Sequence, residues 1–117
     1  MGMKEPLSLL TKQHIFALKT AYFIEYLNSI GYKVTFGEAY RTKEQAEIYA
    51  KEGLGIVHSL HCDRLAVDLN LFDLDDKMLT TFDEIKPFGE HWEQNGPEYR
   101  WGGRFKHLVD LNHFEMD

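Results

Sequence analysis

Two histidines and one aspartate have side chains of the types that form open zinc sites. Asp68 lies in an alternating run from 65 to 72, His61 comes seven residues earlier, and His113 lies near the end of the 117-residue chain. Two histidines and one carboxylate commonly hold zinc and leave a fourth position to water. Such a unit keeps a net charge of +1, so it can still lower the pKa of bound water to about 7. These residue types indicate metal-dependent hydrolysis.

Spacing alone leaves other interpretations open. The chain contains six histidines, which offer many His/Asp combinations. His58 and His107 are rival ligands, and His107 would form a local trio with Asp110 and His113, close together in the sequence. His61 and His113 could also merely form hydrogen bonds with backbone groups.

The elements that must position these residues are helices mixed with short strands. Helical spacing and capping residues predict helices over 7–29, 42–51 and 81–94. Alternation predicts strands over 32–37, 65–72 and 112–116. This mixture without a repeat indicates an α+β fold with a small, largely antiparallel sheet flanked by helices.

Two of these elements have a predicted core face. The strand at 65–72 places Leu65, Val67, Leu69 and Leu71 on one side, which leaves Asp68 on the other. The apolar stripe expected for the first helix consists of Leu10, His14, Ala17, Ala21, Ile24 and Asn28, widened by Leu18, Tyr22 and Leu27.

Composition excludes several classes of protein. With 44% apolar and 14% aromatic residues, the chain has the composition of a packed protein, and its length predicts one domain over 1–117. A net charge of −6 opposes nucleic-acid binding. The most apolar stretch, 15–30, is too polar to span a membrane. No secretory signal is seen and Cys62 is the single cysteine, so we expect a cytosolic protein without disulfides.

Three strings resemble motifs of the VanY-like, LAS-type zinc peptidases, which include D-alanyl-D-alanine peptidases and phage L-alanyl-D-glutamate endopeptidases. Residues 59–68 resemble the signature S-x-H-x-x-G-x-A-x-D. Trp-Gly-Gly at 101–103, followed by Asp-Leu-Asn-His-Phe-Glu at 110–115, resembles the W-G-G and D-x-x-H-F-E ending. Residues 38–45 are similar to the segment Y-R-(S/T)-x-x-x-Q. The three strings follow one another along this chain in the same order as the corresponding motifs of the family.

The resemblance implies a role for each matching residue and a Hedgehog/DD-peptidase-like fold. His61, Asp68 and His113 would bind Zn²⁺. Asp110 would be the catalytic acid/base, which takes a proton from water and returns it to the leaving amine. Arg41 would stabilise the scissile carbonyl or its oxyanion through its fixed donors.

One position departs from the signature, because Arg64 stands where the family has glycine. If this position requires a positive φ, arginine is strained there by about 1 kcal/mol or more. A differently shaped loop is the alternative.

Several neighbouring residues have simpler expected roles. Ser59 is expected to form a loop hydrogen bond and Cys62 to be a small packing residue. Glu115 shares a strand face with His113, so it either bonds a ligand histidine or is an exposed strand carboxylate. The aromatic residues expected in the core are Trp92, Trp101 and Phe105.

Together these observations predict a zinc peptidase that hydrolyses the L-alanyl-D-glutamate bond of the peptidoglycan stem peptide. The Trp-Gly-Gly element favours this bond over D-alanyl-D-alanine, whose carboxypeptidases would use the same chemistry. A non-catalytic peptidoglycan-binding module of a phage particle is the alternative outside enzymes. The resemblance suggests a monomeric phage endolysin that stays in the host cytosol until lysis.

Overall fold

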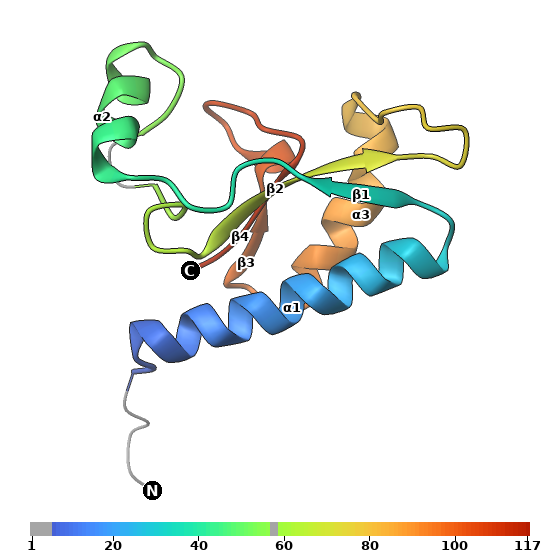
Figure 1. The fold of residues 1–117 in the computed structure, drawn as a ribbon, viewed down its shortest axis with the longest axis horizontal. Coiled ribbons are helices and arrows are strands. Elements are labelled where there is room, and N and C mark those ends of the chain that lie inside the picture. The colour runs from blue at the N-terminus through green and yellow to red at the C-terminus, as the bar shows by residue number, and fades with distance from the viewer. Residues whose placement is uncertain (1–5, 57–58) are drawn as a thin grey trace, which may run out of the picture.

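A computed structural model describes residues 6–56 and 59–117 and confirms the α+β class (Figure 1). Three helices and four strands alternate irregularly along the chain. Their bounds are α1 Leu9–Ser29, β1 Lys33–Phe36, α2 Lys43–Lys51, β2 Ala66–Phe72, α3 Phe82–Glu93, β3 Tyr99–Trp101 and β4 His113–Met116, with a 3₁₀ turn at Gly102–Arg104.

Side-chain caps set where the helices begin, which is where the sequence predicts for α2 and α3 and two residues later than predicted for α1. Ser8 and Thr42 accept hydrogen bonds from backbone N–H groups in the first turns of α1 and α2. Thr81 and Glu84 form a reciprocal capping box at the start of α3. Gly31, at a φ of 95°, ends α1 because the left-handed conformation is accessible to glycine.

The four strands form one antiparallel sheet in the order β1-β2-β4-β3. The sequence predicted three of these strands but missed β3, whose three residues are too few to show an alternating pattern. β4 lies between β2 and β3, so the end of the chain is held at the centre of the sheet.

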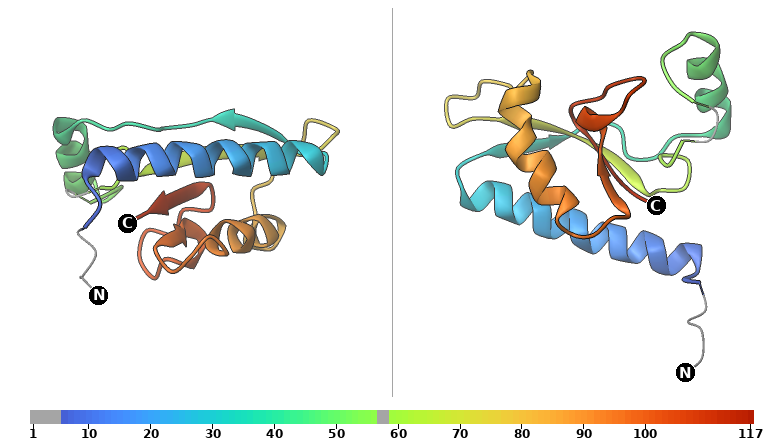
Figure 2. Two further views of the ribbon diagram at one scale, coloured as in Figure 1. Left: turned by 90° about the horizontal axis from the view of Figure 1, so that it is seen from below. Right: turned by 180° about the vertical axis from the view of Figure 1, so that it is seen from behind.

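The predicted leucine face of β2 is buried in the core, together with Phe114 and Trp101. α1 and α3 meet at Trp92, whose ring contacts Phe16 and Phe23. Figure 1 and the right-hand view of Figure 2 show α2 standing apart from both of these helices.

The face that α1 buries differs from the predicted stripe. The buried residues are Phe16, Thr20, Phe23 and Leu27, of which only Leu27 belongs to the predicted stripe. Ile24 of that stripe packs against the core, whereas Leu10 and Tyr22 are exposed. α1 has apolar residues around most of its circumference, so periodicity did not distinguish the two faces. The aromatic rings at 16 and 23, two turns apart, determine which face packs against Trp92.

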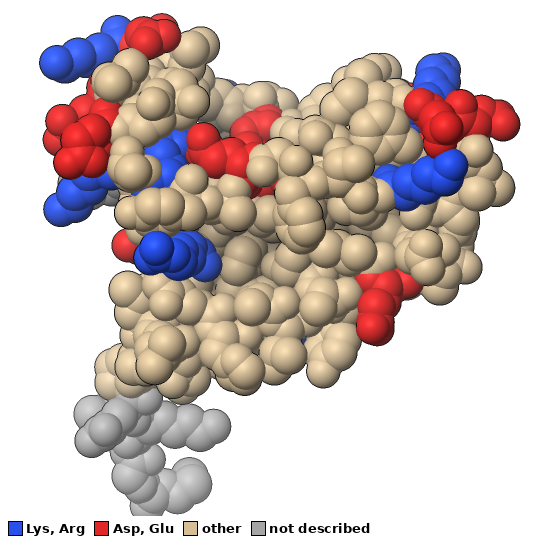
Figure 3. Space-filling view, in the orientation of Figure 1, with Lys and Arg blue, Asp and Glu red and all other residues tan. Residues whose placement is uncertain are grey.

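Charged side chains are unevenly distributed on the surface. In Figure 3 they gather around α2 and at the turn after β2, while the surface over α1 is largely uncharged. Among the residues described, no helix is both long and apolar enough to cross a membrane.

Candidate metal centre

Strands β2 and β4 bring Asp68 and His113 together although 45 residues separate them. The two residues are register partners in the antiparallel pair. Directly opposed side chains on one face of such a pair lie about 5 Å apart at Cβ. Since Val67 and Leu69 are buried in the core, Asp68 points to the opposite face of β2.

His61 lies on a tight turn just before β2. The Leu65 N–H donates to the Leu60 carbonyl and the Arg64 N–H donates to the His61 carbonyl, which is the pattern that ends a helix at a left-handed residue. Arg64 is that residue, with a φ of 57°. The loop therefore keeps the conformation that glycine favours, and the differently shaped loop is not observed.

The buried His61 ring is aimed by a backbone carbonyl. Its Nδ1 lies 3.2 Å from the Ala39 oxygen, so Nδ1 carries the proton of the neutral ring and Nε2 faces the cluster. Ser59, buried as well, accepts a hydrogen bond from the His61 backbone N–H. This is the loop hydrogen bond expected of Ser59.

His113 has the opposite arrangement. Its Nε2 lies 2.6 Å from a Glu115 carboxylate oxygen, so Nε2 carries the proton and Nδ1 faces Asp68 and His61. Glu115 is buried, and of its two expected roles the structure shows the bond to a histidine.

The inward atoms form a nearly equilateral triangle. His61 Nε2 lies 3.1 Å from His113 Nδ1 and 3.3 Å from Asp68 Oδ1, and the last two atoms are 3.2 Å apart. Zinc bonds of about 2.0–2.1 Å at tetrahedral angles place ligand atoms about 3.3 Å apart. Three lone pairs that converge in this way repel one another unless a cation lies among them. The group is therefore positioned to bind a metal ion.

The electrostatics show how strongly this cluster attracts positive charge. Burial by itself lowers the pKa of His113, but its hydrogen bonds to Asp68 and Glu115 raise that pKa to about 9. Burial by itself raises the pKa of Asp68, but hydrogen bonds to both histidines lower it to about 2. A proton on His113 thus takes the place of a cation when none is bound, and a metal ion must displace it.

Asp110 lies at the edge of the triangle, with Oδ2 4.0 Å from His113 Nδ1 and a half-exposed side chain. Burial raises its pKa, and the negative charge of Asp68 raises it further. The Asp110 N–H donates to the Gly102 carbonyl. A side chain at Gly102 would overlap the Asp110 carbonyl, so glycine is required for this close approach.

Trp101 fixes the same turn from the core. Its indole N–H donates to the Leu111 carbonyl at 2.7 Å, and the side chain is fully buried, as expected. Phe105 does not belong to the core: it is partly exposed, packs against the His113 ring at 5.5 Å and lines the cleft described next. Phe105 is flanked by Arg104, Lys106 and His107. These polar neighbours are the signal from which the sequence could have indicated a surface position for Phe105.

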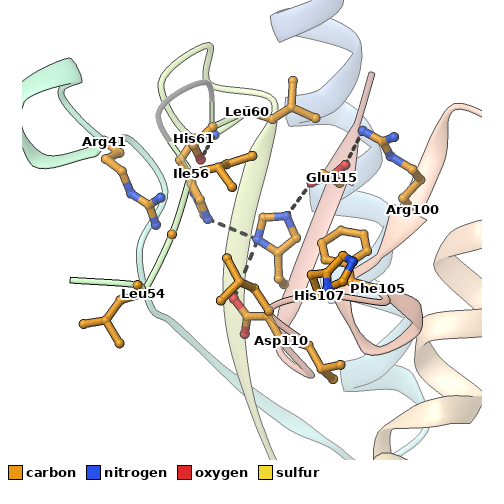
Figure 4. Close-up of a pocket in the computed structure, with 16 residues that line it drawn as sticks. Arg41, Leu54, Ile56, Leu60, His61, Arg100, Phe105, His107, Asp110 and Glu115 are labelled. Atoms are coloured by element: carbon orange, nitrogen blue, oxygen red, sulfur yellow. Dashed lines mark hydrogen bonds and ion pairs between the residues drawn. The ribbon is translucent and has the colours of Figure 1, made fainter. Parts of the chain in front are cut away.

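The triangle opens into a cleft of about 510 Å³. Leu54, Gly55 and Ile56 line it beside α2, and the segment 107–110 lines it opposite (Figure 4). Arg41 also lines the cleft, where its Nε and Nη2 bind Glu38 and its guanidinium stacks on Tyr49. The sequence did not indicate that Glu38 would hold Arg41.

The remaining candidates lie outside the triangle. His107 is exposed on the wall of the cleft, and His61, Asp68 and His113 form the one potential metal-binding group found among the described residues. The local trio of 107, 110 and 113 is therefore not assembled. Cys62 contacts the Thr42 carbonyl instead of the cluster. His58 lies outside the described residues.

A family model described as D-alanyl-D-alanine carboxypeptidase matches residues 53–116, which is more than half of the chain. The chain belongs to this family. Its members are metal-dependent peptidases that act on peptidoglycan, and the resemblance drawn from the three motifs is confirmed.

Similarity of fold extends to a solved structure. The crystal structure of the Serratia marcescens L-Ala D-Glu endopeptidase ChiX matches with a TM-score of 0.59 at 20% identity. The match covers 72% of this chain and 66% of that chain, slightly less than two thirds of its length. None of the curated proteins matches this sequence.

Proposed function

We propose that this protein is a zinc-dependent peptidase that hydrolyses the L-alanyl-D-glutamate bond of the peptidoglycan stem peptide. The observation that carries the proposal is the triangle of donor atoms, which opens into a cleft with a carboxylate at its edge. His61, Asp68 and His113 would hold the cation. A divalent cation there would supply Lewis acidity, which polarises a carbonyl and acidifies water.

Asp110 is the proton carrier in this proposal. Its carboxylate takes a proton from the attacking water and returns it to the amine that leaves. A pKa raised by burial and by Asp68 suits this exchange, because a general acid/base works best when its pKa approaches the ambient pH. Its half-exposed position leaves room for a substrate.

Arg41 stabilises the oxyanion. Its Nε and Nη2 are held by Glu38, so Nη1 remains for a substrate oxygen. Pairing with Glu38 and stacking on Tyr49 fix the guanidinium before substrate binds, which is what stabilisation of a developing charge requires.

The choice of bond rests on the Trp-Gly-Gly element and on the fold shared with an L-Ala D-Glu endopeptidase. The family description favours D-alanyl-D-alanine carboxypeptidase as the second candidate. Mass spectrometry of muropeptides digested by the zinc-loaded protein separates the two. We expect a released peptide that begins with D-glutamate. Release of a terminal D-alanine would instead establish the second candidate.

Substitution of Asp110 tests the mechanism. Asp110→Asn should retain bound zinc but lose roughly two to four orders of magnitude in turnover, which is the usual contribution of a general acid/base. Asp75→Asn, at an exposed turn, is the control and should change neither quantity. Full turnover in Asp110→Asn would remove this residue from the mechanism.

Metal content tests the ligand set. His61→Ala should lose bound zinc, whereas His107→Ala, on the wall of the same cleft, should retain it. The reverse result would restore the local trio of 107, 110 and 113.

The same proposal has a cellular form, in which the protein is a phage endolysin held in the host cytosol until lysis. Added to outer-membrane-permeabilised cells, the protein should clear the suspension, and a chelator should prevent this. Binding to cell walls without clearing would favour a non-catalytic module.

A further inference from the structure

Glu115 is a buried carboxylate whose two oxygens have different partners. Oε1 lies 2.6 Å from His113 Nε2, and Oε2 lies 2.5 Å from Arg100 Nη2 (Figure 4). Its side chain is 8% exposed, whereas that of Arg100 is 48% exposed. A carboxylate this deeply buried requires partners for both oxygens. Here one oxygen contacts His113 on β4 and the other contacts Arg100 on β3.

The strand register builds this chain of contacts. Glu115 is the register partner of Arg100 on β3 and of Ala66 on β2. The small Ala66 leaves space beside the carboxylate, and Arg100 approaches from the other neighbouring strand. His113 and Glu115 are two residues apart on β4, so they share a face. The three adjacent strands β2, β4 and β3 therefore hold the carboxylate in one place.

The two histidines of the triangle are oriented by different groups. A neutral backbone carbonyl fixes His61 through Nδ1, whereas a full negative charge fixes His113 through Nε2. A carboxylate that accepts the outer N–H of an imidazole fixes its tautomer and makes its inner nitrogen a stronger metal ligand.

We propose that Glu115, held by Arg100, is a positioning residue that makes Nδ1 of His113 the metal-binding nitrogen and strengthens it as a ligand. Arg100 acts through Glu115: it occupies the second oxygen, so the first stays directed at His113. This inference rests on the proposed metal site and adds two residues that the cation itself does not touch.

Zinc affinity, measured by competition with a chromophoric chelator, tests the proposal without any substrate. Glu115→Gln should weaken zinc binding by roughly 10- to 100-fold, as is typical when such a partner is removed. Arg100→Gln should weaken binding by a smaller factor, and Arg100→Lys should recover part of the loss because it restores the charge.

Arg104 provides a matched control. Its side chain is 45% exposed and pairs with Glu93 and Glu90 on α3, away from Glu115. Arg104→Gln should leave the zinc affinity unchanged. If Glu115→Gln does not fold, the test compares the zinc affinities of the Arg100 and Arg104 variants, because both side chains are about half exposed. Equal affinities for Arg100→Gln, Arg104→Gln and the wild type would then overturn the inference.

Nitrogen NMR of the imidazole rings supplies a readout that a purely structural ion pair would not move. In the zinc-loaded wild type we expect protonated Nε2 in His113 and protonated Nδ1 in His61. Glu115→Gln should produce mixed tautomers of His113 alone. Unchanged affinity and tautomer in Glu115→Gln would overturn this inference and leave the metal site standing. A wild type that binds no zinc would overturn both.

Discussion

Two regions meet at the metal centre and differ in how they are held. The sheet core, which consists of β2, β3, β4 and α3 with the buried face of α1, supplies Asp68 and His113. The α2 lobe, residues 38–56 and 59–64, supplies His61 and Arg41. Within α2 one residue, Ala46, is buried and Ile48 is exposed, and Leu54 and Ile56 after the helix are exposed as well.

The lobe is tied to the sheet core mainly through backbone contacts. The Asp68 N–H donates to the Glu38 carbonyl, and the N–H of Gly37, which precedes the lobe, donates to the Asp68 carbonyl. Within the lobe, the Arg41 N–H donates to the His61 carbonyl. Two ligands thus come from a packed scaffold and the third from a region with little core of its own. Such regions open locally at low free-energy cost. A cation bound to all three ligands would therefore join the lobe to the sheet core.

The largest stability effect is expected inside the sheet core. Gly89→Ala should improve the intrinsic helix propensity of α3 by about 1 kcal/mol. However, a Cβ at this position would overlap the Trp101 ring. We expect the overpacking to dominate and to lower the free energy of unfolding by about 3 kcal/mol, measured by urea denaturation.

The reverse substitution in the lobe is the matched test. Ala46→Gly should cost about 1 to 2 kcal/mol within α2, from helix propensity and from the buried methyl group. Because the lobe has little core, this loss should appear as faster hydrogen exchange in α2, with less than about 1 kcal/mol lost from global unfolding. Equal global losses in the two variants would show that both regions unfold as one unit.

The sequence predicted β2, β4 and α3 of the sheet core because their signals are local, and it missed only the three-residue β3. Thr81 and Glu84 cap α3, and the alternation from Leu65 to Leu71 identifies the buried face of β2. Pairing is not local, so the sequence did not reveal that Arg100 lies opposite Glu115. The buried face of α1 was also predicted incorrectly, because it depends on where Trp92 lies in the folded chain.

At the candidate site, motif resemblance identified the three residues that converge, but not the means by which they do so. The sequence identifies Trp-Gly-Gly at 101–103 only as a motif of the family. The structure shows the packing that requires these three residues. The Trp101 ring packs where side chains at Gly89 and Gly103 would stand, and Gly102 admits the turn that carries Asp110. Close approaches of this kind depend on tertiary contacts, which a single sequence does not show.

Removal of the metal ion should affect hydrogen exchange in the α2 lobe and in the sheet core differently. Free zinc at 100 times its dissociation constant stabilises the closed lobe by about 2.7 kcal/mol against any opening that breaks the site. Chelation should therefore accelerate hydrogen exchange across the described part of the lobe, while β2 and β4 stay protected. His61→Ala should exchange rapidly with or without chelator. A uniform loss of protection over both regions would contradict the division.

The smallest effect concerns Arg64, at the boundary between lobe and sheet core. Its left-handed φ of 57° is strained for a residue with a Cβ, and its guanidinium stacks 4.1 Å from the centre of the Tyr40 ring. Arg64→Ala loses the stacking and keeps the strain, whereas Arg64→Gly loses the stacking and relieves the strain. The glycine variant should therefore be the more stable of the two by about 1 kcal/mol in thermal denaturation of the metal-free protein. If the alanine variant were equally stable, the turn would be relaxing to another conformation. His61 would then be displaced, and zinc affinity would fall in Arg64→Ala but not in Arg64→Gly.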